Sequence, residues 1–151
     1  MLPEAAQYRD SFKTLHSQLL KHLDGLPPAA LDWVPTPGAN SLTVLVAHAV
    51  GAERFLVAQT VGGADVHRDR DAEFRARGLD GRALIALVET ADIETAALLV
   101  GLTDEEIARE RQLRGSAVTT RWCLVHALEH LAEHVGHAGL TRQLWDAGQS
   151  H

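Results

Sequence analysis

The chain has 151 residues, of which 46% are hydrophobic and 23% are charged. This size and composition are typical of one globular domain spanning residues 1–151, and they argue against a disordered, collagen-like or disulfide-rich protein. The formal net charge of −6 disfavours a nucleic-acid partner, because such proteins normally carry a basic excess or a basic stripe. Histidine is the unusual part of the composition, with nine residues, four of them between His126 and His137.

A cytoplasmic location is expected from the cysteine content and from the start of the chain. The single cysteine, Cys123, cannot form an intramolecular disulfide, which is typical of proteins in reducing compartments. Residues 1–10 have no apolar segment of the kind found in signal peptides. The longest apolar stretches, around 42–50 and 96–100, are far shorter than the roughly 20 residues that span a bilayer, so no membrane partner is expected.

The hydrophobic pattern predicts helices from the beginning of the chain. Residues 4–24 carry apolar side chains at spacings of three and four, and Gly25 ends this first helix. Asn40 and Ser41 are typical N-cap residues for a second helix over 41–61, which a pair of glycines ends.

The second half of the chain continues the helical pattern after a long connection. Residues 64–77 alternate in charge with few apolar anchors and are predicted to be a loop with room for one short exposed helix. A third helix is expected over 81–100, with Asp80 as its N-cap. Residues 107–118 fit either an extended connection or a hairpin, and a long final helix is predicted over 119–146.

Together these elements favour an all-α fold. Four helices of about 20 residues or more, joined by short connections and one long crossover connection, fit a four-helix bundle. Runs of β-branched residues with two-residue alternation are absent from the sequence, so no sheet is expected to form the core.

Four histidines line one face of the last predicted helix. His126, His130 and His134 are spaced four residues apart, and His137 follows three residues later. At about 100° per residue, these side chains fall within an arc of about 80°. Two histidines at positions i and i+4 can hold one metal ion from a single helix face, but tight binding needs a third ligand from another element.

His48 is the candidate for this third ligand. It lies in the middle of the apolar face of the second predicted helix, with Leu45, Ala52 and Leu56 nearby on the helical projection. An unsatisfied polar group buried there would cost about 1–3 kcal/mol, and a shared metal ion would satisfy it. Two structural alternatives stay open: a hydrogen-bonded core histidine at position 48, and a solvated or interface face on the last helix.

Motifs in both halves of the chain resemble those of the DinB superfamily, and the resemblance covers most of the chain, from the first helix to about Trp145. They are Trp-x-Pro-x-Pro-Gly-Ala-Asn-Ser over 33–41, Leu-x-x-His over 45–48, Ala-Glu-Arg over 52–54, and His-x-x-x-His-x-Gly-His over 130–137 with Leu140 and Arg142 after it. Each motif is only moderately specific, but their order and separation make the combination more so.

The resemblance implies a four-helix bundle and a divalent metal ion held by three histidines, which match His48, His130 and His134 by motif. His137 stands where many members of the family have Gln, and His126 is an additional imidazole one turn before the motif. These two are candidates for lining the pocket or for hydrogen-bonding to a ligand. Glu53, near His48 in the sequence, is a further candidate of the same kind.

Three neutral imidazoles would give the metal an open coordination position. Closed structural zinc sites normally have four protein ligands, whereas three ligands and a water are typical of catalytic sites. Such an ion acts as a Lewis acid or lowers the pKa of a bound water or thiol. Ligation by imidazoles alone suits zinc, nickel, copper or iron, of which zinc and nickel are the ions that we expect.

The resemblance implies an enzyme that activates a low-molecular-weight thiol, such as mycothiol or bacillithiol, as an S-transferase or isomerase with a metal-bound thiolate as nucleophile. Hydrolysis by an activated water is a second enzymatic interpretation. A metal-dependent binding or stress-response module without turnover is the main alternative, and a structural bundle with a histidine-lined dimer surface is another. The expected partners are a small-molecule substrate and, in a homodimer, a second copy of the chain.

Other notable residues are assigned structural roles. Cys123 lies about 60° outside the arc of histidines and is interpreted as a small buried hydrophobe rather than a nucleophile. The three tryptophans are interpreted as core or interface aromatics rather than as platforms for a substrate: Trp33, Trp122 and Trp145. The remaining histidines are interpreted as surface residues: His16, His22, His67 and His151.

Overall fold

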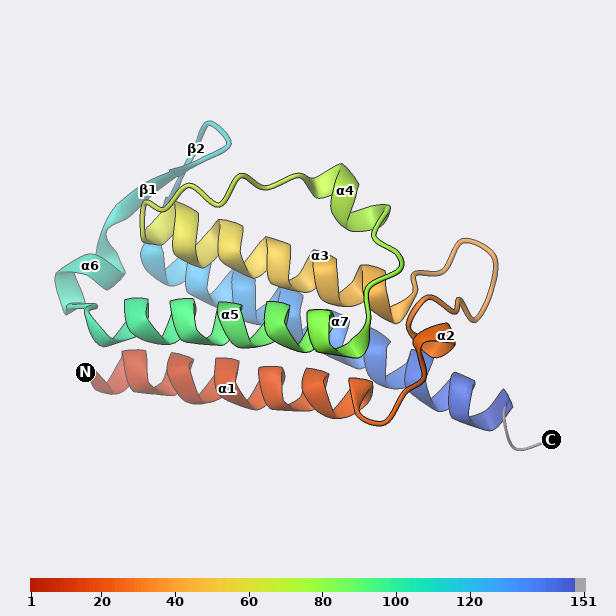
Figure 1. The fold of residues 1–151 in the computed structure, drawn as a ribbon. Helices are drawn as coiled ribbons and strands as arrows, with labels where there is room; N and C mark the ends of the chain where they lie inside the picture. Colours follow the sequence, from red (N-terminus) through yellow and green to blue (C-terminus); the bar gives the residue numbers. More distant parts are fainter. Residues whose placement is uncertain (149–151) are drawn as a thin grey trace.

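Seven α-helices, one π-helix and a two-stranded hairpin make up residues 1–148, the part of the chain that this computed structural model describes (Figure 1). The long elements are α1 (Pro3–Leu23), α3 (Leu42–Arg54) with its continuation η1 (Phe55–Val61), α5 (Gly81–Val100) and α7 (Thr120–Gly148). The short elements are α2 (Pro28–Leu31), α4 (Arg70–Phe74), α6 (Asp104–Ala108), β1 (Glu110–Leu113) and β2 (Ser116–Thr119). The predicted all-α four-helix bundle is confirmed.

Capping side chains determine where the bundle helices begin. The hydroxyl oxygen of Ser41 accepts a hydrogen bond from the backbone N–H of Val44, at the start of α3. The carboxylate of Asp80 accepts one from Ala83 in the same way at the start of α5. Because the first N–H groups of a helix have no partner within it, such side chains stabilise the start by about 1 kcal/mol. The bounds of α5 are those predicted, 81–100.

The second predicted helix, 41–61, is α-helical only in its first part. From Phe55 to Val61 the chain forms a π-helix, η1, and the hydroxyl of Thr60 donates a hydrogen bond to the carbonyl of Phe55 (2.9 Å). π-Helical turns are rare and are frequent at functional sites. Two residues of this element, Phe55 and Leu56, line a pocket that is described below.

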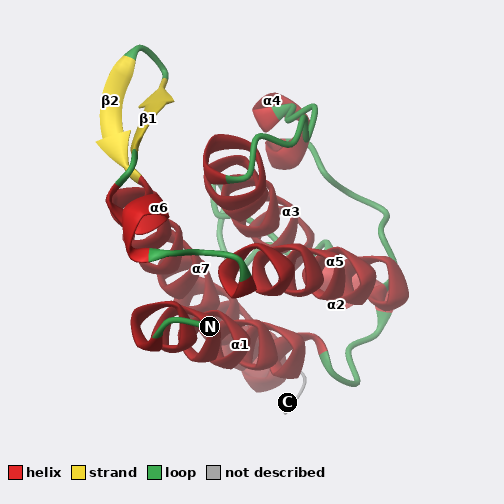
Figure 2. Ribbon diagram, turned by 90° about the vertical axis from the view of Figure 1, so that its left-hand side faces the viewer, coloured by secondary structure: helices red, strands yellow, loops and turns green. Residues whose placement is uncertain are grey.

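The four long helices pack in the cyclic order α1, α5, α3, α7, so that α1 and α3, consecutive in the chain, lie diagonally across the bundle (Figure 2). Figure 1 shows α3 and α5 running in the same direction, opposite to α1 and α7. Because α3 and α5 are parallel neighbours, residues 62–80 must travel the length of the bundle to connect them. This connection is the predicted long crossover, and it carries α4 over α3.

A β-hairpin connects α6 to α7 and extends beyond the end of the bundle (Figure 2). Its strands are antiparallel, with Leu113 opposite Ser116. The two residues between them, Arg114 and Gly115, both have positive φ, 50° and 84°, as a type I′ turn requires. Of the two structures expected for residues 107–118, an extended connection or a hairpin, the chain forms the hairpin.

The core consists of aliphatic side chains from all four long helices, among them Leu19, Leu45, Leu84 and Leu131. The stretch Leu42–Val61 is long and apolar enough to cross a membrane by length and hydropathy alone, but 61% of its most apolar window is buried within the bundle. That degree of burial is typical of the core helix of a water-exposed bundle.

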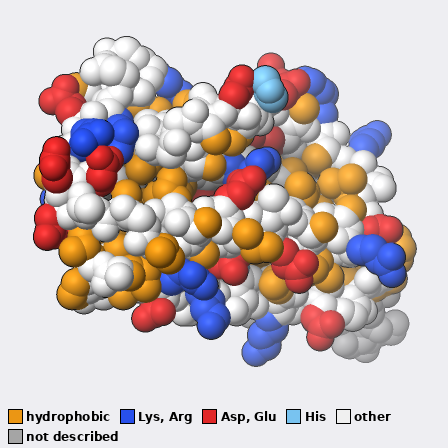
Figure 3. Space-filling view, turned by 60° about the vertical axis from the view of Figure 1, so that its left-hand side comes forward, with side chains coloured by type: hydrophobic (Ala, Val, Ile, Leu, Met, Phe, Trp, Pro, Cys, Tyr) orange, Lys and Arg blue, Asp and Glu red, His pale blue; other side chains and the backbone are white. Residues whose placement is uncertain are grey.

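Charged side chains of both signs are interspersed over the face of the molecule shown in Figure 3. Hydrophobic side chains lie between them, and no continuous basic area is visible on this face. The face therefore lacks the stripe of Lys and Arg that is typical of nucleic-acid binding.

Candidate metal centre

Three histidine side chains from two neighbouring helices converge beneath the crossover. His48 of α3 and His130 and His134 of α7 each offer a ring nitrogen, and these three atoms lie within 4.8 Å of one another. His48 and His134 are buried, whereas His130 is partly exposed. Within residues 1–148 no other group of three or more histidine, cysteine or acidic side chains is arranged in this way.

The spacing of the ring nitrogens fits a small metal ion. Nε2 of His130 and Nε2 of His134 are 3.3 Å apart. Two zinc–nitrogen bonds of about 2.0–2.1 Å at a tetrahedral angle would place their nitrogens about 3.3–3.4 Å apart. Nδ1 of His134 is buried without a hydrogen-bond partner among the described residues, so this ring interacts through Nε2, on the side of the other histidines. The donor set therefore fits a divalent ion.

A carboxylate from the crossover holds the third imidazole ring. Nδ1 of His48 donates a hydrogen bond to Oε2 of Glu73 on α4 (2.8 Å). The guanidinium of Arg68 donates two hydrogen bonds to the same carboxylate, at 2.6 and 2.8 Å. Because Nδ1 of His48 carries the proton, Nε2 is the nitrogen with a free lone pair. Metal-bound histidines commonly donate their other N–H to a carboxylate in this manner.

The protonation states of these groups suit metal binding at neutral pH. Burial, together with the neighbouring His134 and His48, lowers the pKa of His130 to about 4. Burial and His48 also lower the pKa of His134. Burial opposes the ionisation of Glu73, but hydrogen bonds from Arg68 and His48 outweigh it and hold the pKa of that carboxyl below its usual range. Neutral imidazoles are the form that binds a metal.

Gly51 makes room for this carboxylate on the surface of α3. It lies three residues after His48, on the side of the helix over which α4 passes. A Cβ atom at position 51 would overlap the carboxylate of Glu73. The crossover can therefore bring Glu73 to His48 only because residue 51 has no side chain.

A pocket of about 270 Å³ opens beside the histidines. His48 and His130 form part of its wall, so a small molecule in the pocket can reach the candidate centre. Its other lining residues come from the end of α3, η1, the crossover, the hairpin and the start of α7: Ala52, Phe55, Leu56, Arg68, Arg70, Leu113, Arg114, Trp122 and His126. The ring of Trp122 stacks on that of His126, with 4.7 Å between the centroids.

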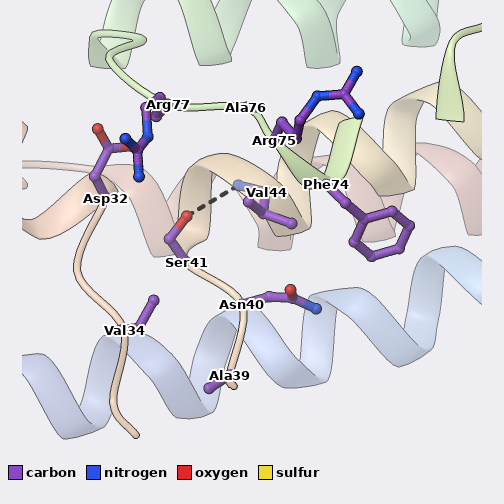
Figure 4. Close-up of a pocket in the computed structure, with 10 residues that line it drawn as sticks. All are labelled: Asp32, Val34, Ala39, Asn40, Ser41, Val44, Phe74, Arg75, Ala76 and Arg77. Atoms are coloured by element: carbon purple, nitrogen blue, oxygen red, sulfur yellow. Dashed lines mark hydrogen bonds between the residues drawn. The ribbon is translucent and has the colours of Figure 1, made fainter. Parts of the chain in front are cut away.

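A larger hollow of about 550 Å³ lies between the α2–α3 connection and the end of α4 (Figure 4). Its described lining residues include Asp32, Ser41 and Arg77 but no histidine. Phe74 also lines it, and the ring of Phe74 packs on the ring of His48 at 4.4 Å between centroids. The hollow therefore borders the candidate centre through Phe74 but offers none of its ligands.

The two additional histidines of α7 have different surroundings. His126 lines the same pocket as His48 and His130. His137 is exposed and lines a different hollow beside Pro35, although its ring lies 5.6 Å from that of His134.

Glu53 lies with His16, not with the histidines of the candidate centre, contrary to expectation. Its Oε2 accepts a hydrogen bond from Nε2 of His16 (2.7 Å), and its Oε1 accepts one from the hydroxyl of Thr95 (2.6 Å). The other ring nitrogen of His16 is 3.1 Å from Oδ1 of Asp92. Five residues correspond to about 140° around a helix, so Glu53 points away from the side that His48 occupies.

The surface interpretation of His16 is wrong, since its side chain is only 3% exposed. The pattern contains a signal for this: His16 follows Phe12 by four residues and precedes Leu19 by three, on the apolar stripe of α1. His22 is half-buried and His67 is exposed, whereas His151 lies outside the described residues.

The tryptophans and the cysteine lie in different surroundings. Trp33 and Trp145 pack edge to face, with 5.6 Å between ring centroids, as expected of structural aromatics. Trp122 instead is 44% exposed and forms part of the pocket wall. Cys123 is fully buried, and burial raises the pKa of its thiol, which agrees with a structural role.

One protein family matches the sequence over nearly its whole length. The family described as mycothiol-S-transferase matches residues 7–147. No curated protein matches the chain.

Several solved structures share the fold. A conserved protein from Enterococcus faecalis has a TM-score of 0.78 at 16% identity, over 95% of this chain and 98% of that chain. The DinB-like protein YjoA from Bacillus subtilis has a TM-score of 0.71 at 22% identity, over 94% and 92%. YfiT from Bacillus subtilis, described as a probable metal-dependent hydrolase with an unusual four-helix bundle topology, has a TM-score of 0.77 at 16% identity, over 95% and 89%.

Proposed function

The chain belongs to the mycothiol-S-transferase family of DinB-like proteins, and from this premise we propose that it is a metal-dependent enzyme that activates a low-molecular-weight thiol. The observation that carries the proposal is the convergence of His48, His130 and His134 at the wall of a pocket. Three histidine ligands leave a coordination position for a reactant, which is the pattern of catalytic metal sites.

A divalent ion held by these histidines would lower the pKa of a coordinated thiol or water and so supply a nucleophile at neutral pH. The protein residues prepare the site for it. Glu73 accepts the Nδ1 proton of His48 and so fixes the tautomer that presents Nε2. Arg68 keeps Glu73 ionised. Because Cys123 is fully buried and burial raises its pKa, the reactive sulfur would come from a cosubstrate.

Metal-dependent hydrolysis is the second candidate, because the same ligand set can activate water. YfiT, with a TM-score of 0.77, is described as a probable metal-dependent hydrolase. The family match over residues 7–147 favours thiol transfer. A metal-dependent binding or stress-response module would use the same ligands without turnover.

The remaining properties follow from this chemistry. We propose zinc or nickel as the ion, since neutral imidazoles suit both. We propose a cytoplasmic location, where low-molecular-weight thiols are kept reduced. The substrate is a small molecule, not nucleic acid, in keeping with the net charge of −6. Leu140 and Leu144, which are exposed on α7, support a homodimer that buries this part of the helix.

Metal content and thiol conjugation test the proposal together. Protein purified without a His tag should contain about one metal ion per chain. The metal-loaded protein should conjugate 1-chloro-2,4-dinitrobenzene with at least one of mycothiol, bacillithiol, glutathione and cysteine. Chelation should abolish the activity, and zinc or nickel should restore it.

A matched pair of histidine variants provides the control. His134→Ala should lose both metal and activity, whereas His67→Asn, a change at an exposed histidine that does not line the pocket, should retain both. Metal binding without turnover on any of these thiols or on simple esters would favour the binding module. Protein that takes up neither zinc nor nickel would overturn the metal centre itself.

A further inference from the structure

The wall of the pocket beside the three histidines carries an excess of positive charge. Arg68, Arg70 and Arg114 line it, and no acidic side chain is among its described lining residues. Arg68 is paired with Glu73. Within residues 1–148, neither Arg70 nor Arg114 makes a salt bridge or a side-chain hydrogen bond to a carboxylate. The pocket wall therefore has an excess of positive charge, although the chain as a whole has a net charge of −6.

Arg114 has a backbone conformation that is unfavourable for its residue type. At the tip of the hairpin its φ is 50°, in the left-handed region that Gly, Asn and Asp adopt most readily. The first position of a type I′ turn is normally occupied by such residues. Strain at a non-glycine residue beside a pocket points to a role for its side chain.

Aromatic rings hold the three guanidinium groups, and those of Arg70 and Arg114 keep their N–H edges available for a ligand. The guanidinium of Arg114 lies 5.3 Å from the centroid of Phe55, and that of Arg68 lies 5.4 Å from the same ring. Arg70 lies 4.8 Å from the centroid of Phe74. A guanidinium stacked on a ring retains a planar fork of donors that matches a carboxylate. Such preorganisation reduces the entropy lost when a ligand binds.

We propose that Arg114 and Arg70 bind the carboxylate of a reactant that occupies the pocket beside the metal centre. This inference rests on the proposed function, because it takes the pocket beside the three histidines as the place where reactants bind. The carboxylate belongs to either the electrophile or the thiol, and the two sources are separable by experiment. The stack of Trp122 on His126 offers a flat wall for an unsaturated part of the reactant.

Equilibrium binding tests the proposal without turnover. The zinc-loaded full chain is titrated calorimetrically with 4-nitrobenzoate and with 4-nitrobenzamide, its uncharged analogue of similar shape. We expect the acid to bind about tenfold more tightly than the amide, as for a hydrogen bond to a charged group. Arg114→Asn, which tolerates the left-handed turn, should remove most of this preference, and Arg70→Gln should reduce it further. Arg82→Gln is the control, because it removes the same charge from an exposed position of α5 outside the pocket, and it should keep the preference for the acid.

Two binding results would overturn the proposal. The first is equal affinity of the native protein for acid and amide. The second is a preference for the acid that survives in the Arg114→Asn/Arg70→Gln double variant and disappears when zinc is removed, because the metal would then be what binds the carboxylate. Failure of this proposal is distinguishable from failure of the proposed function. A protein that conjugates thiols but shows no preference for the acid would contradict only the role of the arginines.

Paired conjugation assays identify which reactant carries the carboxylate. 4-Chloro-3-nitrobenzoate and its amide vary the electrophile, while N-acetylcysteine and its amide vary the thiol. Arg114→Asn should lower kcat/KM about tenfold for the acid of one pair and leave the amide of that pair unchanged. Equal losses for acid and amide in both pairs would overturn the proposal, because they would indicate general damage to the pocket.

Discussion

The carboxylate of Glu73 links the crossover to the candidate ligand His48. It accepts the Nδ1 proton of His48 and is held by two hydrogen bonds from Arg68. In Glu73→Gln, the amide has one acceptor oxygen for three N–H donors, and its NH₂ group would face a guanidinium or an imidazole N–H. We therefore expect zinc affinity to fall about 10- to 100-fold, as for other residues that orient metal-bound histidines.

Competition with a chromophoric chelator measures this loss of zinc affinity. Glu106→Gln is a suitable control, because Glu106 of α6 lies outside the pocket and pairs with Arg109, just after this helix, and with Arg111 of the hairpin. Unchanged zinc affinity in Glu73→Gln would mean that Glu73 only anchors the crossover.

Gly51→Ala tests the same contact without changing a polar group. A Cβ at position 51 would overlap the Glu73 carboxylate and displace it from His48. Alanine is otherwise favoured over glycine within a helix by about 1 kcal/mol, so any loss of zinc affinity would come from the displaced carboxylate. At Gly136, also within a helix, a Cβ meets no atom within 4 Å, and Gly136→Ala should raise the thermal midpoint and leave zinc affinity unchanged. Equal zinc affinity in Gly51→Ala and the native chain would contradict the role of this close approach.

The ligand candidates could be predicted from the sequence, whereas the residues that orient them could not. Helical periodicity places His130 and His134 on one face, and an apolar face contains His48. Arg68 and Glu73 lie in a connection without periodicity, where only the folded chain determines which side chains meet. An unpartnered histidine on an apolar face predicts that some partner exists but not where it lies in the sequence.

A buried polar cluster connects three helices away from the metal centre. His16 of α1 lies between Glu53 of α3 and Asp92 of α5, with both ring nitrogens directed at carboxylate oxygens. Both nitrogens must donate to satisfy these acceptors, so the ring is an imidazolium. Burial opposes this charge, but hydrogen bonds with Glu53 and Asp92 outweigh it and raise the pKa of His16.

This cluster predicts how the stability of the metal-free protein depends on pH. A histidine whose pKa is raised by folding stabilises the protein fully at pH values below its pKa in the unfolded chain, about 6.5. This stabilisation is lost as the pH rises through the pKa of the same histidine in the folded protein. The free energy of unfolding in urea should therefore decrease as the pH rises from about 7.5 through the raised pKa of His16. Above about pH 7.5, His130 and His134, whose pKa values are lowered, add almost no slope, because they are then neutral in both states. Nearer pH 6.5 the unfolded chain still binds protons at these two histidines, which gives a slope of the opposite sign.

Glu53→Gln should reduce this slope, because it removes the principal partner of the imidazolium. It should also destabilise the protein by up to about 3–5 kcal/mol at the low end of the range, where a buried charge loses its counterion. Glu94→Gln, which breaks a half-exposed pair with Arg54, should leave the slope unchanged. Native stability that is constant or rises over this range would contradict an imidazolium at position 16.

Elements with clear boundary residues could be predicted, and those set by tertiary packing could not. Asp80 and Gly101 flank α5, and its predicted range, 81–100, is its observed range. Within 41–61 most residues are apolar on both sides of Phe55, so hydrophobic periodicity gives no sign of the change to a π-helix there. His16 is the opposite case, because its position on the apolar stripe of α1 already indicated that its side chain is buried.

At the scale of the whole molecule, the order of the helices explains why a loop takes part in the site. Because α3 and α5 are parallel neighbours, their connection returns along the bundle and passes over α3 (Figure 1). This path brings Arg68, Glu73 and Phe74 to His48. A bundle with antiparallel neighbours and short loops would have no segment in this place. The topology thus provides both the candidate ligands and the groups that orient them.

The candidate ligands lie on two helices, so metal binding should stabilise the bundle as a whole. An ion that binds only the folded state at 100 times its dissociation constant adds about 2.7 kcal/mol to the free energy of unfolding. For a chain of this length, that corresponds to a rise in the thermal midpoint of about 5–10 °C. Differential scanning fluorimetry of the metal-free protein with added zinc measures this rise.

The variants distinguish binding at this site from nonspecific effects of zinc. His134→Ala should lose the rise, and His67→Asn should keep it. Glu73→Gln should need about 10- to 100-fold more zinc for the same rise, since its ligands are present but less well oriented. An equal rise in the thermal midpoint of His134→Ala and of the native chain would mean that zinc binds elsewhere, because the loss of a ligand would then not weaken the stabilisation by zinc.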